Sequence, residues 1–190
     1  MNISIEQTRI PGVLIITPQV FTDQRGFFLE VFREDIFAAQ GLPARYCQLN
    51  HSASVRNVVR GLHFQWEPAM GKLMRVIAGA AFLVAVDIRH GSPTLGQYFA
   101  TEVTAESHTL IWAPAGFARG FAVLSESAEI EYLCTGVYNA KGEGGIRWND
   151  PEIGVHWPVS QPILAPKDET AQTLAQWLAR SESRAFTFGS

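Results

Sequence analysis

Two glycine-containing segments of the sequence carry the residue types best suited to chemistry. The first reads Gly61-Leu62-His63-Phe64-Gln65-Trp66-Glu67, and the second reads Pro114-Ala115-Gly116-Phe117-Ala118-Arg119-Gly120. Glutamine is a weak ligand for transition metals, and the guanidinium of Arg119 has no lone pair to donate. One histidine and one glutamate rarely hold a metal without further ligands. The segments therefore predict proton transfer by His63, with no metal site.

Both segments resemble the paired motifs of cupins, small β-barrels that often bind a metal inside. In metal-binding cupins the first motif supplies His-x-His and a later Glu, and the second motif supplies another His. This chain has Gln65 and Arg119 at two of those positions. The resemblance therefore implies a cupin-type barrel that has lost its metal ligands but retains His63.

The segments that must position these residues read mostly as short strands, separated by glycine, proline and asparagine turns. Residues 82–88 have apolar side chains on one face, and residues 129–138 alternate so that Tyr132, Cys134 and Tyr138 share a face. Further strands are expected at 12–17, 26–32, 72–77, 95–103, 108–113 and 120–124. Many short strands at this spacing predict an all-β fold, either a sandwich or a jelly-roll barrel.

Helical patterns are few. Residues 33–40 predict a short helix that ends at Gly41, and residues 170–180 predict an amphipathic helix packed on the barrel. The length of 190 residues fits a single domain. We expect one cupin-like domain over 1–190, with the barrel core at about 45–140 and a C-terminal helical extension at about 168–183.

Composition excludes several classes of partner. The formal net charge of −3 argues against general nucleic-acid binding, which needs a broad basic surface. The N-terminus has no basic segment followed by a long apolar run, and the apolar stretch at 80–86 is far too short to span a membrane. We expect a cytoplasmic protein without a membrane partner. Cys47 and Cys134 are expected to be buried free thiols.

Several separated motifs occur along the chain in a specific order. They are Asp23-Gln24-Arg25-Gly26-Phe27-Phe28-Leu29-Glu30, Gln48-Leu49-Asn50-His51-Ser52, Arg60-Gly61-Leu62-His63-Phe64-Gln65, Gly71-Lys72-Leu73, Val86-Asp87-Ile88-Arg89, Glu131-Tyr132-Leu133-Cys134-Thr135, Trp148-Asn149-Asp150-Pro151 and Lys167-Asp168. With these motifs the chain resembles the dTDP-4-dehydrorhamnose 3,5-epimerase family. The resemblance implies an enzyme without a cofactor that inverts carbon 3, carbon 5 or both in a 4-keto-6-deoxyhexose carried on a nucleoside diphosphate. It also implies a homodimer in which an N-terminal strand crosses to the partner.

Inversion next to a ketone needs a base on one face of the sugar, a cation or donor at the ketone oxygen, and an acid on the opposite face. The resemblance assigns these roles to His63, Lys72 and Tyr132, and it makes Asp168 the carboxylate that orients the imidazole. Asp168 also precedes a helix-like segment, so an N-cap remains an alternative role for it. A tyrosine on a mostly apolar strand face is also compatible with simple packing.

The resemblance also places substrate contacts. Arginines bind phosphate oxygens well because their donors are planar and bidentate, and Arg25 and Arg60 match the diphosphate contacts. Strict alternation would put Arg60 and His63 on opposite faces of a strand, unless a bulge at Gly61 turns both toward the cavity. The remaining candidates match positions that contact the nucleotide or the sugar; they are Glu30, Gln48, Asn50, Tyr138 and Glu143.

The second motif departs from the family pattern, which has His where this chain has Arg119. A fixed positive charge there would stabilise an enolate or bind a different group of the substrate, so Arg119 joins the substrate-binding candidates. Three alternatives to a double epimerase stay open. They are a single-site epimerase or one that uses another nucleotide, a metal-free sugar-nucleotide ketoisomerase, and a non-catalytic cupin that binds a sugar nucleotide.

Overall fold

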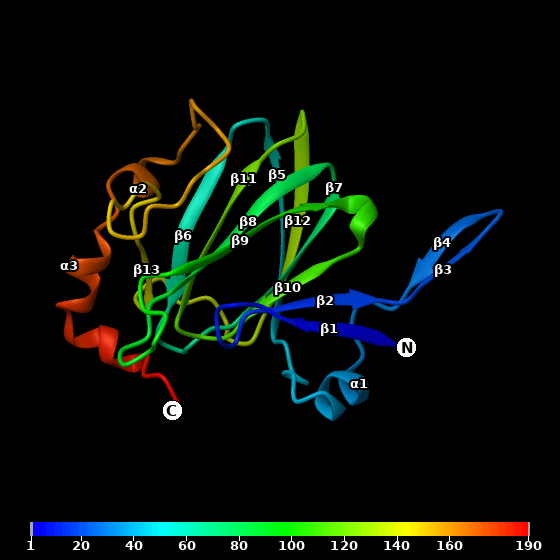
Figure 1. Cartoon of the computed structure of the whole chain (residues 1–190), viewed down its shortest axis with the longest axis horizontal. Helices are drawn as coiled ribbons and strands as arrows, with labels where there is room; N and C mark the ends of the chain where they lie inside the picture. Colours follow the sequence, from blue (N-terminus) through cyan, green and yellow to red (C-terminus); the bar gives the residue numbers. More distant parts are fainter. Residues whose placement is uncertain (1, 190) are drawn as a thin grey trace.

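Two antiparallel sheets face each other and form the body of the molecule (Figure 1), in a computed structural model that describes residues 2–189. In spatial order, the first sheet contains β1 (Ile3–Gln7), β2 (Leu14–Pro18), β10 (Leu110–Ala113), β7 (Lys72–Ala78), β12 (Ser127–Cys134) and β5 (Gln48–Val55). The second contains β13 (Glu143–Gly145), β6 (Val59–Gln65), β11 (Phe117–Val123), β8 (Ala80–Asp87) and β9 (Tyr98–Thr104). The predicted all-β jelly-roll barrel is confirmed, and β1, β2 and β13 join it from outside the range 45–140.

Strand β8 is buried on both faces, which explains its nearly continuous apolar sequence. Leu83 and Ala85 point into the core between the two sheets. Val84 and Val86 point the other way, into a second core that the C-terminal segment covers with Trp177. The expected alternation of residues 82–88 is therefore present. Its outward-facing side chains, Val84 and Val86, pack against the C-terminal segment and hold it on the barrel.

The C-terminal segment forms two short helices, α2 (Pro166–Glu169) and α3 (Leu174–Leu178), followed by a 3-10 turn at Ser181–Ala185. The amphipathic helix expected at 170–180 is present but shorter, because it spans only Leu174–Leu178, with Leu174 and Trp177 buried. The backbone at Gln172 pairs with Ile146 and accepts a bond from Arg147 N, so the chain is extended there. Helix α3 then starts at its own capping box on Thr173. No helix within residues 2–189 is long and apolar enough to cross a membrane.

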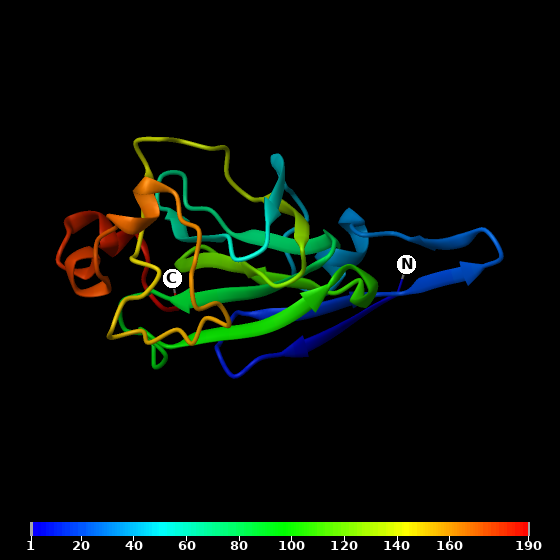
Figure 2. The ribbon, with the colours of Figure 1, turned by 90° about the horizontal axis from the view of Figure 1, so that it is seen from above.

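A two-stranded hairpin, β3 (Val20–Asp23) and β4 (Gly26–Leu29), extends away from the barrel (Figures 1 and 2). It carries three large apolar side chains that are at least half exposed, Phe21, Phe27 and Phe28. Helix α1 (Glu34–Ala39) follows the hairpin and confirms the helix expected at 33–40. The hairpin thus presents a largely exposed apolar surface, although the ring of Phe27 also contacts His108.

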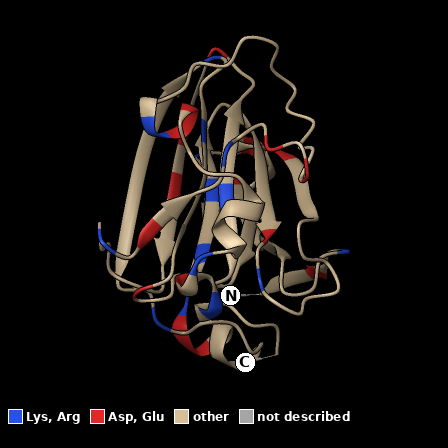
Figure 3. Cartoon of the chain, turned by 90° about the vertical axis from the view of Figure 1, so that its left-hand side faces the viewer, with Lys and Arg blue, Asp and Glu red and all other residues tan. Residues whose placement is uncertain are grey.

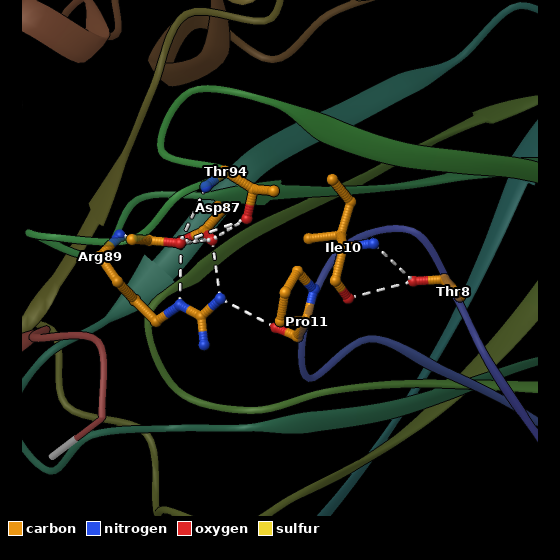
Figure 4. A network of polar contacts seen from close by, with 7 residues as sticks. Thr8, Ile10, Pro11, Asp87, Arg89 and Thr94 are labelled. Atoms are coloured by element: carbon orange, nitrogen blue, oxygen red, sulfur yellow. Dashed lines mark hydrogen bonds and ion pairs between the residues drawn. The ribbon is translucent and has the colours of Figure 1, made fainter.

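A buried ion pair fastens the turn between β1 and β2 to the end of β8 (Figure 4). Arg89 donates to both carboxylate oxygens of Asp87, and its Nη2 donates to the carbonyl of Pro11 at 2.9 Å. The hydroxyls of Ser92 and Thr94 donate to the same carboxylate. Burial by itself would raise the pKa of Asp87, but these hydrogen bonds outweigh burial and hold the pKa below its usual value.

Strand β12 ends at Cys134, earlier than the sequence pattern predicted. It ends there because both neighbouring strands begin at the paired residues, Lys72 and Gln48. Tyr138 therefore lies in the following loop and not on the strand face, which corrects its expected position.

The prediction that both cysteines are buried free thiols is partly wrong. Both thiols are free, and Cys134 is buried, but Cys47 is exposed.

Candidate active site

A cavity of about 440 Å³ lies between the two sheets beside α2, within the size range of small-ligand sites. Its walls include apolar side chains such as Met74 and Phe121. Its polar lining brings together all four catalytic candidates and two of the substrate-binding candidates. These residues are His63, Lys72, Tyr132, Asp168, Arg60 and Arg119.

The histidine and the aspartate expected to act together are in direct contact. Nε2 of His63, on β6, lies 2.5 Å from Oδ1 of Asp168, in α2. Oδ2 of Asp168 accepts a bond from Gly61 N, and the residue is 2% exposed. Burial would raise the pKa of Asp168, but His63 and Gly61 outweigh burial and lower it. The N-cap alternative is wrong, because α2 is capped by Ala165 and α3 by Thr173.

A bulge at Gly61 turns two candidate side chains, those of Arg60 and His63, into the same cavity, so the bulged strand is the one of the two alternatives that is present. On β11, Arg119 pairs with His63 but Phe121 pairs with Arg60, so β6 holds one extra residue at this point. Gly61 has a φ of 122°, and a Cβ there would lie 2.6 Å from Gly120 Cα. Only glycine fits this backbone.

Lys72 stands at the start of β7, on the sheet opposite His63. Its Nζ lies 5.6 Å from the centroid of the Tyr132 ring, and within residues 2–189 no carboxylate pairs with it. Burial lowers the pKa of Lys72, and the charge of Arg119 lowers it further, whereas Cys134 acts in the opposite direction. An ammonium without a carboxylate partner is available to a developing negative charge on a ligand.

Tyr132 lies on β12 in the same sheet as Lys72 and pairs in register with Asn50 on β5. Burial raises the pKa of the Tyr132 hydroxyl, so the hydroxyl holds its proton at neutral pH and can donate it. His63 belongs to the other sheet. The candidate base and the candidate acid therefore line the cavity from facing sheets.

Arg119 reaches from one sheet to the other. It pairs in register with His63 and Ala85 on its own sheet. Its guanidinium donates to the carbonyl of Lys72 at 3.4 Å and approaches Met74 Sδ at 3.2 Å, both on β7. The residue is 4% exposed, and burial lowers its pKa to about 9.

Four other candidates form a polar group beside the cavity without lining it. The Tyr138 hydroxyl donates to Glu143 Oε1 at 2.8 Å, and Gln48 accepts from Tyr138 N and donates to Asn50. Glu143 also lies 3.9 Å from the ammonium of Lys167. Lys167 lines the cavity and was missed as a site residue, although its position next to Asp168 was a usable signal.

Two candidates lie elsewhere in this copy of the chain. Arg25 is on the projecting hairpin, where it pairs with Asp23 at 2.6 Å. Glu30 follows the hairpin and lies 3.6 Å from Arg33. Neither lines the cavity, and the hairpin extends away from the end of the molecule that holds α2 (Figure 1).

The cavity is basic although the whole chain is slightly acidic. Four cationic side chains line it against the single carboxylate of Asp168; they are Arg60, Lys72, Arg119 and Lys167. Figure 3, seen from the side of α2 and α3, shows lysine and arginine positions on the barrel strands. Within residues 2–189 no group of three or more His, Cys, Asp or Glu side chains is placed to hold a metal. Such a cavity suits an anionic organic ligand.

Gln65 has a structural role in this fold. Its amide nitrogen donates to the carbonyls of Pro68 and Val137, and its oxygen accepts from Asn139 N. The side chain is therefore used to hold two loops together and is 2% exposed.

The chain matches known proteins along most of its length. A family model described as dTDP-4-dehydrorhamnose 3,5-epimerase matches residues 7–176. A protein of that name from Salmonella typhimurium is 49% identical over 175 residues, covering 90% of this chain and 96% of that protein. Another protein of that name, from Neisseria gonorrhoeae, is 47% identical over 173 residues. That protein is longer than this chain, so the match covers 90% of this chain but 53% of that protein.

A solved structure of an epimerase is also similar to this chain along nearly its whole length. The dTDP-6-deoxy-D-glucose-3,5-epimerase of Legionella pneumophila, in complex with dTDP-4-keto-L-rhamnose, has a TM-score of 0.92 and 40% identity, with 98% of each chain covered. The resemblance in the sequence motifs is thereby confirmed, and the chain belongs to the dTDP-4-dehydrorhamnose 3,5-epimerase family.

Proposed function

We propose that this protein is a cofactor-independent isomerase that epimerises a nucleotide-linked 4-keto-6-deoxyhexose, of the dTDP-4-dehydro-6-deoxyglucose 3,5-epimerase type. One observation carries the proposal: His63 and Tyr132 line one cavity from facing sheets, with Lys72 beside the tyrosine. Inversion of a carbon requires a base and an acid on opposite faces of the sugar ring, and this arrangement supplies both.

In the proposed mechanism His63 takes the proton from the carbon next to the ketone. The electron pair of the broken C–H bond moves toward the ketone oxygen, where the ammonium of Lys72 stabilises the negative charge. Tyr132 then gives its proton to the carbon from the opposite face. The anionic Asp168 holds the imidazole in place and stabilises its protonated form. Exchange of protons with water restores His63 and Tyr132.

The substrate is proposed to lie with its diphosphate toward Arg60 and Lys167, which are cationic residues of the cavity lining. The nucleoside would then lie over the polar group beside the cavity, in contact with Gln48, Asn50, Tyr138 and Glu143. Arg119 lines the same cavity, where its guanidinium donates to the carbonyl of Lys72, and it is proposed to contact the sugar. The dTDP nucleotide is the one carried by the ligand of the similar Legionella pneumophila structure.

The working form is proposed to be a homodimer. The exposed Phe27 and Phe28 of the hairpin are apolar surface that a second copy would cover. The same hairpin would bring Arg25 and Glu30 to the cavity of the partner, which accounts for their distance from their own. The cytoplasmic location and the division into domains expected from the sequence stay predictions.

Proton exchange tests the proposal. The protein is incubated in heavy water with 4-keto-6-deoxyglucose nucleotides of dTDP, CDP, GDP and UDP, and the ring protons are followed by NMR. Exchange at carbons 3 and 5 with the dTDP sugar is expected; exchange at one carbon indicates a single-site enzyme, and movement of the carbonyl indicates a ketoisomerase. Lack of exchange with all four nucleotides would contradict the proposal and leave a binding protein.

Matched histidine variants identify the base. His63→Ala should abolish exchange and leave nucleotide binding largely intact. His51→Ala is the control, because His51 lies on the exposed side of β5 and contacts Glu129, away from the cavity. Equal exchange by the two variants would contradict the role of His63.

A further inference from the structure

The guanidinium of Arg119 is a buried positive charge that has no carboxylate partner in the described part of the chain. Its neighbours are two carbonyls and a thioether, those of Val84, Lys72 and Met74, at 3.2–3.4 Å. A guanidinium has five N–H donors, so these contacts leave donor capacity unused. Within residues 2–189 no carboxylate lies at ion-pair distance from Arg119. A buried charge without compensation is costly to the fold, so its position calls for an anion that arrives from the cavity.

The position of Arg119 relates it to the two groups that would act on the sugar. It pairs in register with His63, so the two side chains leave neighbouring strands on the same side. Its guanidinium contacts the backbone of Lys72 on the facing sheet. Both cations line the cavity and both lack a carboxylate partner among the described residues. Two cations without a carboxylate partner among residues 2–189 therefore line the same cavity as the candidate base, and the guanidinium of one contacts the backbone of the other.

We propose that Arg119 and Lys72 together form a two-cation site for the oxygen of the enolate. This inference rests on the proposed function and adds a second catalytic cation to it. The ketone oxygen of the substrate is neutral, and it becomes negative only when His63 has removed the adjacent proton. A pair of cations held in place by the barrel interacts more strongly with that anion than with the ketone, and so it accelerates proton removal.

A charge-matched set of variants tests the site. Arg119→Gln removes the charge and retains hydrogen-bond donors, whereas Arg119→Lys retains the charge. We expect Arg119→Gln to lower kcat for epimerisation about 100-fold while KM changes less than about threefold, because only the transition state loses an interaction. Arg119→Lys should recover at least about a tenth of the wild-type kcat. Arg9→Gln, an exposed arginine that donates to the Tyr98 carbonyl, is the control and should leave both constants unchanged.

Folding is checked independently by thermal unfolding and by the affinity for dTDP alone. Arg119→Gln should bind dTDP as tightly as the wild type, because the nucleoside is proposed to lie over the polar group beside the cavity and not at the oxygen site. If Arg119→Gln fails to fold, Arg119→Lys and Arg119→His provide the comparison, and the lysine variant should have the higher kcat at pH 8. A kcat within about threefold of wild type for a folded uncharged variant, or a change confined to KM, overturns the inference.

The alkaline limb of the plot of kcat against pH tests whether the charge of Arg119 lies close enough to Lys72 to act with it, whereas the loss of kcat in Arg119→Gln tests its role in catalysis. Lys72 must carry its proton to stabilise the enolate, and the groups acting on Lys72 are Cys134, Arg119, Glu143 and Lys167, with the Tyr132 ring alongside. Removing the charge of Arg119 should move this limb to higher pH. A limb that stays in place overturns the inference. A wild-type protein that exchanges no ring proton would instead overturn the proposed function itself.

Discussion

His63 and Asp168 are 105 residues apart in the sequence, yet Nε2 of the imidazole lies 2.5 Å from Oδ1 of the carboxylate. The carboxylate is almost completely buried and also accepts a bond from the backbone of the Gly61 bulge. The bulge that turns His63 into the cavity is therefore tied to the group that holds the imidazole. This arrangement fixes the direction in which the second ring nitrogen points.

Replacing the carboxylate of Asp168 should reveal how much its contact with His63 contributes to catalysis. Asp168→Asn keeps the size of the side chain but cannot stabilise a protonated imidazole. We expect kcat for epimerisation to fall by about 10³-fold or more, since removing the equivalent carboxylate from a catalytic histidine in other enzymes has effects of that order. The control is Glu169→Gln, the exposed neighbour in α2. A loss below about tenfold in the NMR assay would contradict the role of Asp168.

Tyr132→Phe should separate proton removal from inversion. His63 would still remove the proton and return deuterium from the same face, but no acid would remain on the opposite face. We expect exchange of solvent deuterium into the substrate to persist while formation of the inverted product falls by about 100-fold or more. Tyr46→Phe is the control, because the Tyr46 hydroxyl is buried, has no hydrogen-bond partner among residues 2–189 and lies outside the cavity lining. If Tyr132→Phe lowers exchange and inversion by the same factor, another group is the acid.

The parts of this site that could be predicted from the sequence are those on regular strands. The alternation of residues along a strand placed Tyr132 on an inward face, and the glycine in the first motif indicated where a bulge could unite Arg60 with His63. These features depend on local geometry, which a short segment specifies by itself. The resemblance to a family added Asp168, whose contact with His63 no local pattern encodes.

The errors have a common cause, which is pairing between distant segments. Tyr138 left its expected strand because the neighbours of β12 begin at Cys134 and offer no further partner. The helix expected at 170–180 begins only at Leu174, because the backbone at Gln172 pairs with Ile146. Propensity and periodicity describe a segment alone, and tertiary hydrogen bonds decided both cases.

The Asp87–Arg89 pair should make a large and pH-dependent contribution to stability. Asp87 is completely buried, and replacing it by Asn would leave Arg89 without its partner. We expect Asp87→Asn to lower the free energy of unfolding by about 3 kcal/mol at pH 7, measured by urea denaturation. Asp35→Asn is the control, because it removes an exposed carboxylate and should change the free energy of unfolding little.

The pH dependence of this difference follows from the lowered pKa of Asp87. In the unfolded chain the carboxyl has its ordinary pKa of 3.8, and in the folded protein the value is lower. The stabilisation is therefore fully present above that value and is lost as the pH falls through the folded pKa. The difference in the free energy of unfolding between the wild type and Asp87→Asn should narrow below about pH 4. A gap that is constant down to pH 2 would contradict this account.

The aromatic side chains of the hairpin should hold the proposed dimer together. Phe27 and Phe28 are 61% and 64% exposed in a single chain, and burying them against a second copy removes apolar surface from water. We expect Phe27→Ser combined with Phe28→Ser to shift the protein from dimer to monomer in light scattering at micromolar concentration. Phe188→Ser, an exposed aromatic residue near the C-terminus, is the control. A double variant that stays dimeric would place the interface elsewhere.

Mixing two inactive variants should test whether the hairpin serves the partner. If Arg25 acts in the partner's cavity, a heterodimer of Arg25→Ala and His63→Ala contains one cavity with both native residues. Random reassortment of the two variants should then restore about a quarter of the wild-type kcat/KM. His63→Ala mixed with Asp168→Asn is the control, because both residues belong to the same cavity of one chain and no native cavity can form. Recovery in the first mixture only would assign Arg25 to the partner, whereas no recovery in either mixture would leave Arg25 without a role in catalysis across the interface.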